Sequence, residues 1–132
     1  MECKIIATGI LKHEDKYLVV KRSDDDNFLP GSWEFPGGNL EIGETILEGL
    51  KRELNEEIGF NITNEDVKLI GYSDEIKNNN NSIVHVIEFD FLVDCLNEDI
   101  NILLSNEHSE YRWVTKDFEL LDDFILSKIK KL

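Results

Sequence analysis

A cluster of acidic side chains follows an arginine near the middle of the chain. Glu56 and Glu57 lie three and four residues after Glu53, and Arg52 directly precedes Glu53. On a helix, residues at these spacings project from the same side. At about 4 Å and an effective dielectric near 20, each pair of like charges repels by roughly 4 kcal/mol. We therefore expect the cluster to bind divalent cations such as Mg²⁺, and a solvated acidic helix face is the competing interpretation.

The segment before this cluster is rich in glycine, with Gly37 and Gly38 followed by Gly43. Backbone N–H groups in a glycine-rich loop and at a helix N-terminus are donors for anions such as phosphate. Arg52 can also neutralise part of the acidic charge. These features favour a metal and phosphate site over a merely solvated helix face.

The acidic cluster needs a helix to position it, and residues 45–58 have a helical pattern. Apolar residues recur there at three- and four-residue steps, which predicts one buried stripe: Ile46, Leu47, Leu50, Leu54 and Ile58. Thr45 to Glu48 fits a capping box, and Gly59 fits a C-terminal stop. Gly49 inside the helix costs up to about 1 kcal/mol relative to Ala, and close packing against another backbone would explain it.

The remaining elements are predicted from concentrated or alternating apolar and aromatic residues. Strands are expected at 3–11, 17–21, 33–35, 67–76, 82–93 and 111–114. Loops are expected at 13–15, 23–32, 77–81 and 95–106. A second helix is expected from Phe118 to Ile129. Together these elements predict a single α/β (α+β) domain over residues 1–132, folded as a sandwich around a mixed β-sheet.

The bulk composition limits the class of protein and of partner. A chain of 132 residues with 41% hydrophobic and 32% charged residues fits one globular domain. The formal net charge of −14 repels nucleic-acid phosphates, so no long nucleic-acid partner is expected. No membrane span or signal segment is recognisable, which predicts a cytoplasmic protein. Cys3 and Cys95 are expected to be ordinary packing residues, and both a monomer and a homodimer remain open.

Residues 38–60 carry a motif that is far more specific than the acidic spacing alone. They match the Nudix box, G-x5-E-x7-R-E-U-x-E-E-x-G-U with U apolar, at every fixed position. The fixed positions are Gly38, Glu44, Arg52, Glu53, Leu54, Glu56, Glu57, Gly59 and Phe60. Residues 33–38 and 107–114 also resemble segments of MutT-type members. The chain therefore resembles the Nudix hydrolase family, and the resemblance spans most of its length.

The resemblance implies both a fold and a metal-dependent reaction. The family's fold is an α/β/α sandwich, and its members hydrolyse a nucleoside diphosphate linked to another moiety. By this resemblance Glu56 and Glu57 bind Mg²⁺, with Mn²⁺ as a substitute. Glu53 is a further ligand or the base that activates water. Gly37 offers its backbone carbonyl to the metal.

Other box residues are implied to support these ligands. Arg52 would orient a glutamate rather than touch the substrate. Glu44 would brace the loop against the helix, and Gly38 and Gly59 would have structural roles. Gly38 is also a candidate for binding the substrate through its backbone.

Outside the box, the candidate site residues are fewer. Glu107 is a candidate metal ligand, and Glu107 or Glu110 could be the general base in place of Glu53. Arg22 at the end of a strand could meet substrate phosphates. His108 is interpreted as a surface or packing histidine.

Three functions are compatible with these motifs. The first is a MutT-type nucleoside triphosphate pyrophosphohydrolase that acts on a small nucleotide, with oxidised nucleotides such as 8-oxo-dGTP among its candidate substrates. The second is hydrolysis of ADP-ribose or a dinucleoside polyphosphate. It is disfavoured because no proline follows the box and Lys77 and Asn78 stand where a tyrosine is often found. The third is a non-catalytic nucleotide sensor. It is disfavoured because the box glutamates are all present.

Overall fold

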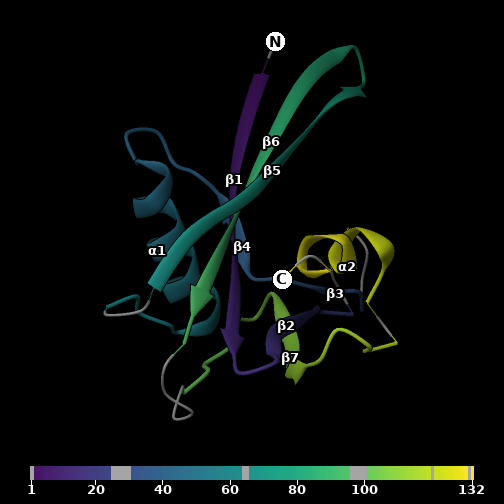
Figure 1. Cartoon of the computed structure of the whole chain (residues 1–132). Coiled ribbons are helices and arrows are strands. Elements are labelled where there is room, and N and C mark those ends of the chain that lie inside the picture. Colours follow the sequence, from purple (N-terminus) through teal and green to yellow (C-terminus); the bar gives the residue numbers. More distant parts are fainter. Residues whose placement is uncertain (1, 25–30, 64–65, 96–100, 120, 131) are drawn as a thin grey trace.

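The computed structural model describes residues 2–24, 31–63, 66–95, 101–119, 121–130 and 132 (Figure 1). The elements in these residues are, in chain order, β1 (Glu2–His13), β2 (Lys16–Arg22), β3 (Trp33–Glu34), β4 (Gly37–Asn39), α1 (Ile46–Ile58), β5 (Asp66–Asn79), β6 (Ser82–Asp94), β7 (His108–Val114) and α2 (Asp123–Ile129). The two predicted helices and the predicted strands are therefore present, with changes in their bounds.

The strands form one mixed sheet around β1. The main order is β3-β2-β1-β6-β5, with β4 paired to β1 and β7 paired to β2. β1 runs parallel to β6, and the other pairings are antiparallel. The mixed sheet predicted from the sequence is confirmed. Its topology brings β4, which leads into α1, directly against the middle of β1.

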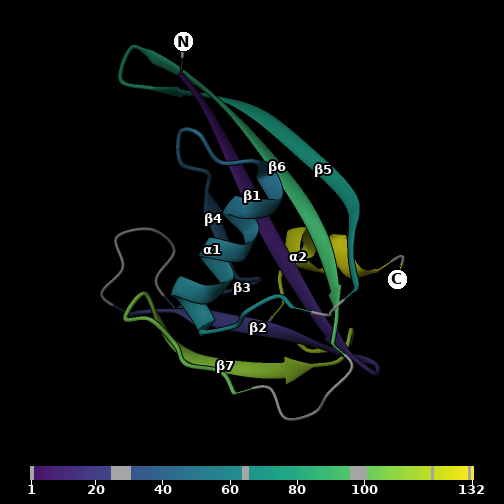
Figure 2. The same ribbon diagram turned by 90° about the vertical axis from the view of Figure 1, so that its left-hand side faces the viewer.

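The two helices cover opposite faces of this sheet (Figures 1 and 2). Leu18 and Val20 of β2 belong to the apolar cluster around α1. Tyr17 and Val19, which alternate with them, belong to the cluster around α2. Because successive strand residues point to opposite faces, one short strand contributes to both layers of the core. The α/β/α sandwich is thus confirmed.

α1 has the caps and most of the stripe that its sequence predicts. Thr45 caps the N-terminus by accepting a hydrogen bond from the backbone N–H of Glu48 at 3.1 Å, and Gly59 ends the helix with a left-handed backbone. Ile46 in the first turn is partly buried and packs against the core, whereas its neighbour Leu47 is 43% exposed. The assignment of Leu47 to the buried stripe was wrong, because one residue further along a helix is a rotation of about 100°, which turns Leu47 away from the face that packs on the core.

Gly49 is explained by the loop before the helix. A Cβ atom at Gly49 would lie 1.9 Å from Cδ2 of Leu40. A glycine is therefore needed at this position because the side chain of Leu40 lies against it. The expectation that another backbone packs closely here was wrong. Leu40 is packed against the apolar core from this position.

Two strand predictions need correction. Residues 37–39, which lie outside the strands predicted from the sequence, form β4 and pair with Ile6–Thr8 of β1. Glycine has a low strand propensity, and here the pairing with β1 overrides it. The expected loop at 77–81 is largely strand, since β5 and β6 are paired up to Asn79 and Ser82. Only Asn80 and Asn81 form the turn, with positive φ angles of 45° and 70°.

The C-terminal elements also differ from their predicted bounds. β7 begins at His108 rather than at Tyr111. α2 begins only at Asp123, because the Asp122 side chain accepts a hydrogen bond from the Ile125 N–H at 2.8 Å and caps the helix there. Parts of the predicted loops at 23–32 and 95–106 lie outside the described residues.

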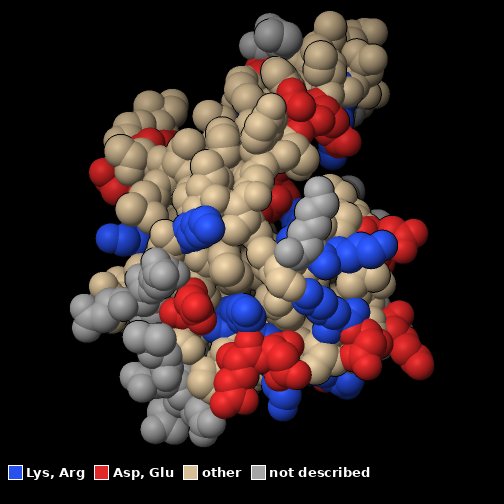
Figure 3. Space-filling view, viewed as in Figure 1, with Lys and Arg blue, Asp and Glu red and all other residues tan. Residues whose placement is uncertain are grey.

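The surface agrees with a strongly acidic chain that still carries basic groups. On the face drawn in Figure 3, acidic and basic side chains lie mixed over the lower half of the molecule. Cys95 is buried as expected, whereas Cys3 is exposed, so its assignment to packing was wrong. Neither helix in the described part of the chain has both the length and the apolar character needed to cross a membrane.

Candidate active site

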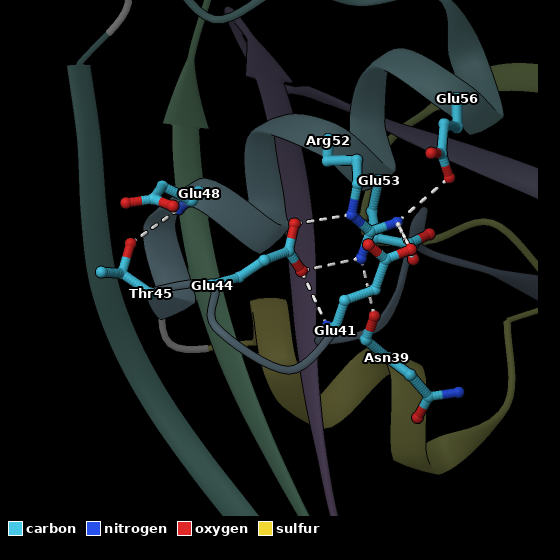
Figure 4. Close-up of polar contacts among 8 residues, drawn as sticks. All are labelled: Asn39, Glu41, Glu44, Thr45, Glu48, Arg52, Glu53 and Glu56. Atoms are coloured by element: carbon cyan, nitrogen blue, oxygen red, sulfur yellow. Dashed lines mark hydrogen bonds and ion pairs between the residues drawn. The ribbon is translucent and has the colours of Figure 1, made fainter.

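Arg52 connects the box carboxylates on α1 with the loop that precedes the helix (Figure 4). Its guanidinium donates two hydrogen bonds to Glu44, from Nε at 2.7 Å and from Nη2 at 3.0 Å. Nη1 donates to Glu53 at 3.0 Å and to Glu56 at 3.1 Å. Nη2 also donates to the carbonyl oxygen of Asn39 at 2.9 Å. A planar, permanently charged group is suited to hold several carboxylates at fixed angles.

Glu44 closes the loop between β4 and α1. Its Oε1 accepts a hydrogen bond from the backbone N–H of Glu41 at 2.8 Å while the same carboxylate binds Arg52. The bond from Arg52 is the main reason why the pKa of Glu44 is lowered, with the backbone bond adding to it. Glu44 therefore fastens the loop to the helix in the manner expected of a bracing residue.

Gly38 allows Glu53 to lie directly against the backbone of β4. A Cβ atom at Gly38 would be 2.4 Å from Oε2 of Glu53, so a side chain there would displace the carboxylate. Burial is the main factor that raises the pKa of Glu53, and Arg52 partly opposes it. The negative charges of Glu56 and Glu107 raise it further. A positive ion next to this carboxylate would reverse these effects.

Glu57 is the most enclosed carboxylate of the box, with only 8% of the residue exposed. Its Oε2 accepts a hydrogen bond from the backbone N–H of Gly37 at 3.0 Å. Burial raises the pKa of Glu57 to about 7, even though the Gly37 N–H and the positive field of His108 oppose this shift. A carboxylate held in such surroundings is a favourable ligand for a cation.

Glu107 in the turn before β7 and His108 at the start of β7 add two more polar groups. Glu57, Glu107 and His108 each offer an atom that can bind a metal, and these atoms lie within 4.8 Å of one another. The turn is fixed on both sides. The Ser105 N–H donates to the Glu57 carbonyl at 2.9 Å, and the Ser23 N–H donates to the Glu107 carbonyl at 3.0 Å.

Glu34 of β3 lies behind this group and joins two basic side chains. Its Oε1 is 2.9 Å from Nε2 of His108. Nη1 of Arg22 donates to both carboxylate oxygens of Glu34, at 2.9 and 3.0 Å. Burial alone would lower the pKa of His108, but the bond to Glu34 and the charges of Glu57 and Glu107 together raise it.

The donor set fits a hard divalent cation. Carboxylate oxygens of Glu57 and Glu107 and an imidazole nitrogen of His108 lie within 4.8 Å of one another. Glu53 and Glu56, on the same helix as Glu57, are held by Arg52. Such ions prefer oxygen ligands and tolerate imidazole, and their charge offsets the repulsion between the carboxylates. The arrangement is suited to binding metal-bound phosphates rather than to covalent catalysis.

Comparison with known proteins supports this chemistry, since residues 4–126 match the family described as NUDIX domain. The chain belongs to the NUDIX domain family. Nucleoside triphosphatase NudI of Enterobacter sp. (strain 638) is 31% identical over 120 residues, which cover 89% of this chain and 85% of the relative. The protein of that name from Escherichia coli O17:K52:H18 is 29% identical over 119 residues, covering 86% of this chain and 83% of the relative.

Solved structures of Nudix proteins share the fold. The MutT NUDIX hydrolase from Burkholderia pseudomallei superimposes with a TM-score of 0.80 at 18% identity, covering 100% of this chain and 99% of that one. The dihydroneopterin triphosphate pyrophosphohydrolase of E. coli gives a TM-score of 0.79 at 18% identity, with coverage of 100% and 97%. This Nudix protein is accordingly a hydrolase that acts on pyrophosphate bonds.

The structure places the predicted site residues of the Nudix box together and separates some of the others. Glu107 joins the box at Glu57. Glu110, the other candidate base, instead accepts a hydrogen bond from Nε of Arg112 at 2.8 Å on β7. Arg22, considered as a phosphate ligand, contacts Glu34.

Two residues of the Nudix site were missed by reasoning from the sequence. His108 is buried beside Glu57 and Glu107, and Glu34 holds it. The signals for His108 were its position directly after Glu107 and its place in the segment 107–114 that resembles MutT-type members. Glu34 lies in the segment 33–38 that resembles MutT-type members, but nothing in that segment indicated its contact with His108, which depends on β2 pairing with both β3 and β7.

Proposed function

We propose that this Nudix hydrolase is a Mg²⁺-dependent pyrophosphohydrolase of nucleoside triphosphates, which releases a nucleoside monophosphate and pyrophosphate. The observation that carries the proposal is the buried Glu57 carboxylate, held by the Gly37 N–H beside Glu53 and Glu107. The relatives named nucleoside triphosphatase, which align over most of this chain, favour triphosphates as the substrate class. We place the protein in the cytoplasm, where such nucleotides are abundant.

The reaction requires water, a base and a held diphosphate. The water oxygen forms a bond to one of the two phosphorus atoms that flank the α–β bridging oxygen. The bond from that phosphorus to the bridging oxygen breaks, and the bridging oxygen leaves with the other product. The water proton passes to a carboxylate, for which Glu53 is the leading candidate and Glu107 the second.

The residues of the chain have separate tasks in this reaction. A divalent ion, when bound, supplies positive charge for the phosphate oxygens and lowers the pKa of water. Glu56, Glu57 and Glu107 are the residues that would hold this ion. Arg52 keeps the carboxylates of Glu53 and Glu56 at fixed positions, which matters because phosphoryl transfer depends mainly on positioning and electrostatics.

The first prediction is that Glu57→Gln lowers kcat/KM for nucleoside triphosphates by at least about 100-fold at saturating Mg²⁺. The substitution preserves the shape and removes the ionised ligand. Pyrophosphate release measures the rate. Glu48→Gln is the matched control, because Glu48 is exposed in the first turn of the same helix and should leave the rate unchanged. A Glu57→Gln enzyme with the wild-type rate would overturn the proposed role.

The substrate class is tested with a panel of ribo- and deoxyribonucleoside triphosphates, 8-oxo-dGTP, ADP-ribose and dinucleoside polyphosphates. The proposal predicts that kcat/KM is highest for a triphosphate and that the products are a monophosphate and pyrophosphate. Faster turnover of ADP-ribose or a dinucleoside polyphosphate would contradict the proposal and identify that compound class as the substrate. Tight nucleotide binding without turnover of any of these compounds would indicate a sensor.

A further inference from the structure

His108 is among the most enclosed polar side chains in the described part of the protein. Only 6% of the residue and 3% of its side chain are exposed. Nε2 lies 2.9 Å from Oε1 of Glu34, whereas Nδ1 is buried with no hydrogen-bond partner among the described residues. An unpaired buried polar atom costs about 1–3 kcal/mol. A nitrogen in this state requires a partner that the described residues do not supply.

The surroundings of the imidazole indicate which partner is missing. A ligand atom of His108 lies within 4.8 Å of carboxylate oxygens from both Glu57 and Glu107. Ligands on opposite sides of an ion with bonds of about 2.1 Å are about 4.2 Å apart, so small side-chain shifts would let the three groups share one cation. Glu57 and Glu107 can only accept hydrogen bonds when they are ionised, so a cation is the ligand that fits between them and the imidazole.

Glu34 supplies the support that a histidine ligand requires. A histidine that binds a metal through one ring nitrogen commonly donates the N–H of the other to a carboxylate, which fixes the tautomer and the orientation of the ring. The carboxylate of Glu34 is at hydrogen-bonding distance from Nε2 and is itself held by two bonds from Arg22. With the proton at Nε2, the lone pair is at Nδ1, the nitrogen that has no partner.

We propose that Nδ1 of His108 is a direct ligand of the divalent ion bound by Glu57 and Glu107, and that Glu34 and Arg22 position it. This inference rests on the proposed function, since it concerns the same metal. A nitrogen ligand shifts the preference of an oxygen-rich site from Mg²⁺ toward first-row transition ions such as Mn²⁺. The expected result is that Mn²⁺ binds at least about ten times more tightly than Mg²⁺.

Electron spin-echo spectroscopy of bound Mn²⁺ tests the nitrogen directly and does not depend on activity. Mn²⁺ is added below stoichiometry to the full chain, so that weak surface sites stay empty. The wild-type spectrum should show ¹⁴N modulation, which should change to the ¹⁵N pattern when only the histidines are ¹⁵N-labelled. Bound Mn²⁺ without histidine coupling in the wild-type protein would overturn the inference, and this measurement needs no variant.

Two variants assign the nitrogen to one residue. His108→Gln should abolish the histidine coupling and bring the Mn²⁺ and Mg²⁺ affinities closer together. His85→Gln is the matched control. His85, on β6, is also 2.8 Å from a carboxylate, that of Asp74, but it does not belong to the group formed by Glu57, Glu107 and His108. Coupling that persists in His108→Gln would overturn the assignment.

A third variant tests the positioning role of Glu34. Glu34→Gln should keep the histidine coupling but weaken Mn²⁺ binding by about 10-fold or more, because the imidazole loses its charged hydrogen-bond partner. An unchanged affinity would overturn this role.

The two proposals fail in different ways. Metal-dependent hydrolysis with no histidine coupling would remove the ligand role and keep the proposed function. Histidine-coupled Mn²⁺ without hydrolysis of any triphosphate would keep the ligand role of His108 and remove the proposed function.

Discussion

At the scale of single residues, the site depends on close contacts that leave little room for substitution. The carboxylate of Glu53 lies against Gly38, and Arg52 holds that carboxylate from the other side. Glu57 is fixed in a similar way by the N–H of Gly37. Each of these two carboxylates therefore has a neighbour that sets its position, which is what phosphoryl-transfer chemistry requires.

The second prediction concerns Gly38. Gly38→Ala should leave the folded state nearly as stable, since the atoms in the way are the end of the Glu53 side chain, but it should push that carboxylate out of position. We expect kcat to fall by about 10- to 100-fold with a change in unfolding free energy under about 1 kcal/mol. Steady-state kinetics and urea denaturation measure the two effects.

The control for this glycine is Gly71→Ala on β5. A Cβ atom at Gly71 would meet nothing within 4 Å, so neither activity nor stability should change appreciably. An unchanged kcat in Gly38→Ala would show that the position of Glu53 is not critical for catalysis.

At the scale of elements, α2 is attached to the sheet by a buried charged group as well as by apolar contacts. Nζ of Lys128 binds Glu88 and lies 3.1 Å from Oδ1 of Asp90, and both of these residues are on β6. The Lys128 side chain is only 7% exposed. Burial raises the pKa of Asp90 to about 6 and lowers the pKa of Lys128 to about 8.

The third prediction is that Lys128→Met destabilises the protein by about 3 kcal/mol at pH 7. Removing the cation leaves two partly buried carboxylates without their partner, and breaking a buried ion pair from one side typically costs this much. Urea denaturation measures the change. Lys130→Met at the exposed end of α2 is the control and should change stability by less than about 0.5 kcal/mol. Equal effects of the two substitutions would contradict the attachment of α2 through Lys128.

The fourth prediction is that Asp90 titrates near pH 6 in the folded protein. Because this pKa lies above the ordinary value of 3.8, the folded chain keeps a proton that the unfolded chain has released between about pH 4 and 6. The contribution of Asp90 to the free energy of unfolding is therefore complete below pH 4 and is lost as the pH rises through 6. NMR titration of the side-chain carboxyl carbon measures the midpoint. A midpoint near 3.8 would contradict the effect of burial.

At the scale of the whole molecule, metal binding and folding should be coupled. The carboxylates of the site come from α1 and from the turn before β7, and their mutual repulsion adds to that of a chain with net charge −14. An ion that binds only the folded arrangement stabilises it by mass action. An ion held by Glu57 and Glu107 would connect α1 with the turn before β7.

The fifth prediction is that Mg²⁺ or Mn²⁺ raises Tm. At 100 times the dissociation constant the stabilisation is about 2.7 kcal/mol, which corresponds to roughly 10 °C for a domain of this size. Thermal unfolding followed by circular dichroism measures the shift, and EDTA should reverse it. NaCl at matched ionic strength controls for screening of the net charge. The metal-induced rise in Tm should be mostly lost in Glu57→Gln. A wild-type Tm that changes with neither metal would contradict the coupling between metal binding and folding.

Local patterns in the sequence determined the helix, most of the strands and the core of the site. The three- and four-residue apolar spacing, Thr45 and Gly59 placed α1 between Ile46 and Ile58. The alternation of Phe89 and Phe91 with Glu88 and Asp90 indicated β6. These predictions succeed because helix and strand periods are properties of a short stretch of backbone, and the box spacing is read along that same stretch.

Only the tertiary structure decided which distant residues complete the site. Glu107 and His108 lie 50 or more positions after Glu57, and Glu34 lies 74 positions before His108. Their meeting depends on β2 pairing with both β3 and β7. The strand at Gly37–Asn39 likewise exists because β1 pairs with it, against the low strand propensity of glycine. Pairing between strands is a long-range contact whose free energy depends on the whole sheet, so no local spacing in the chain encodes it.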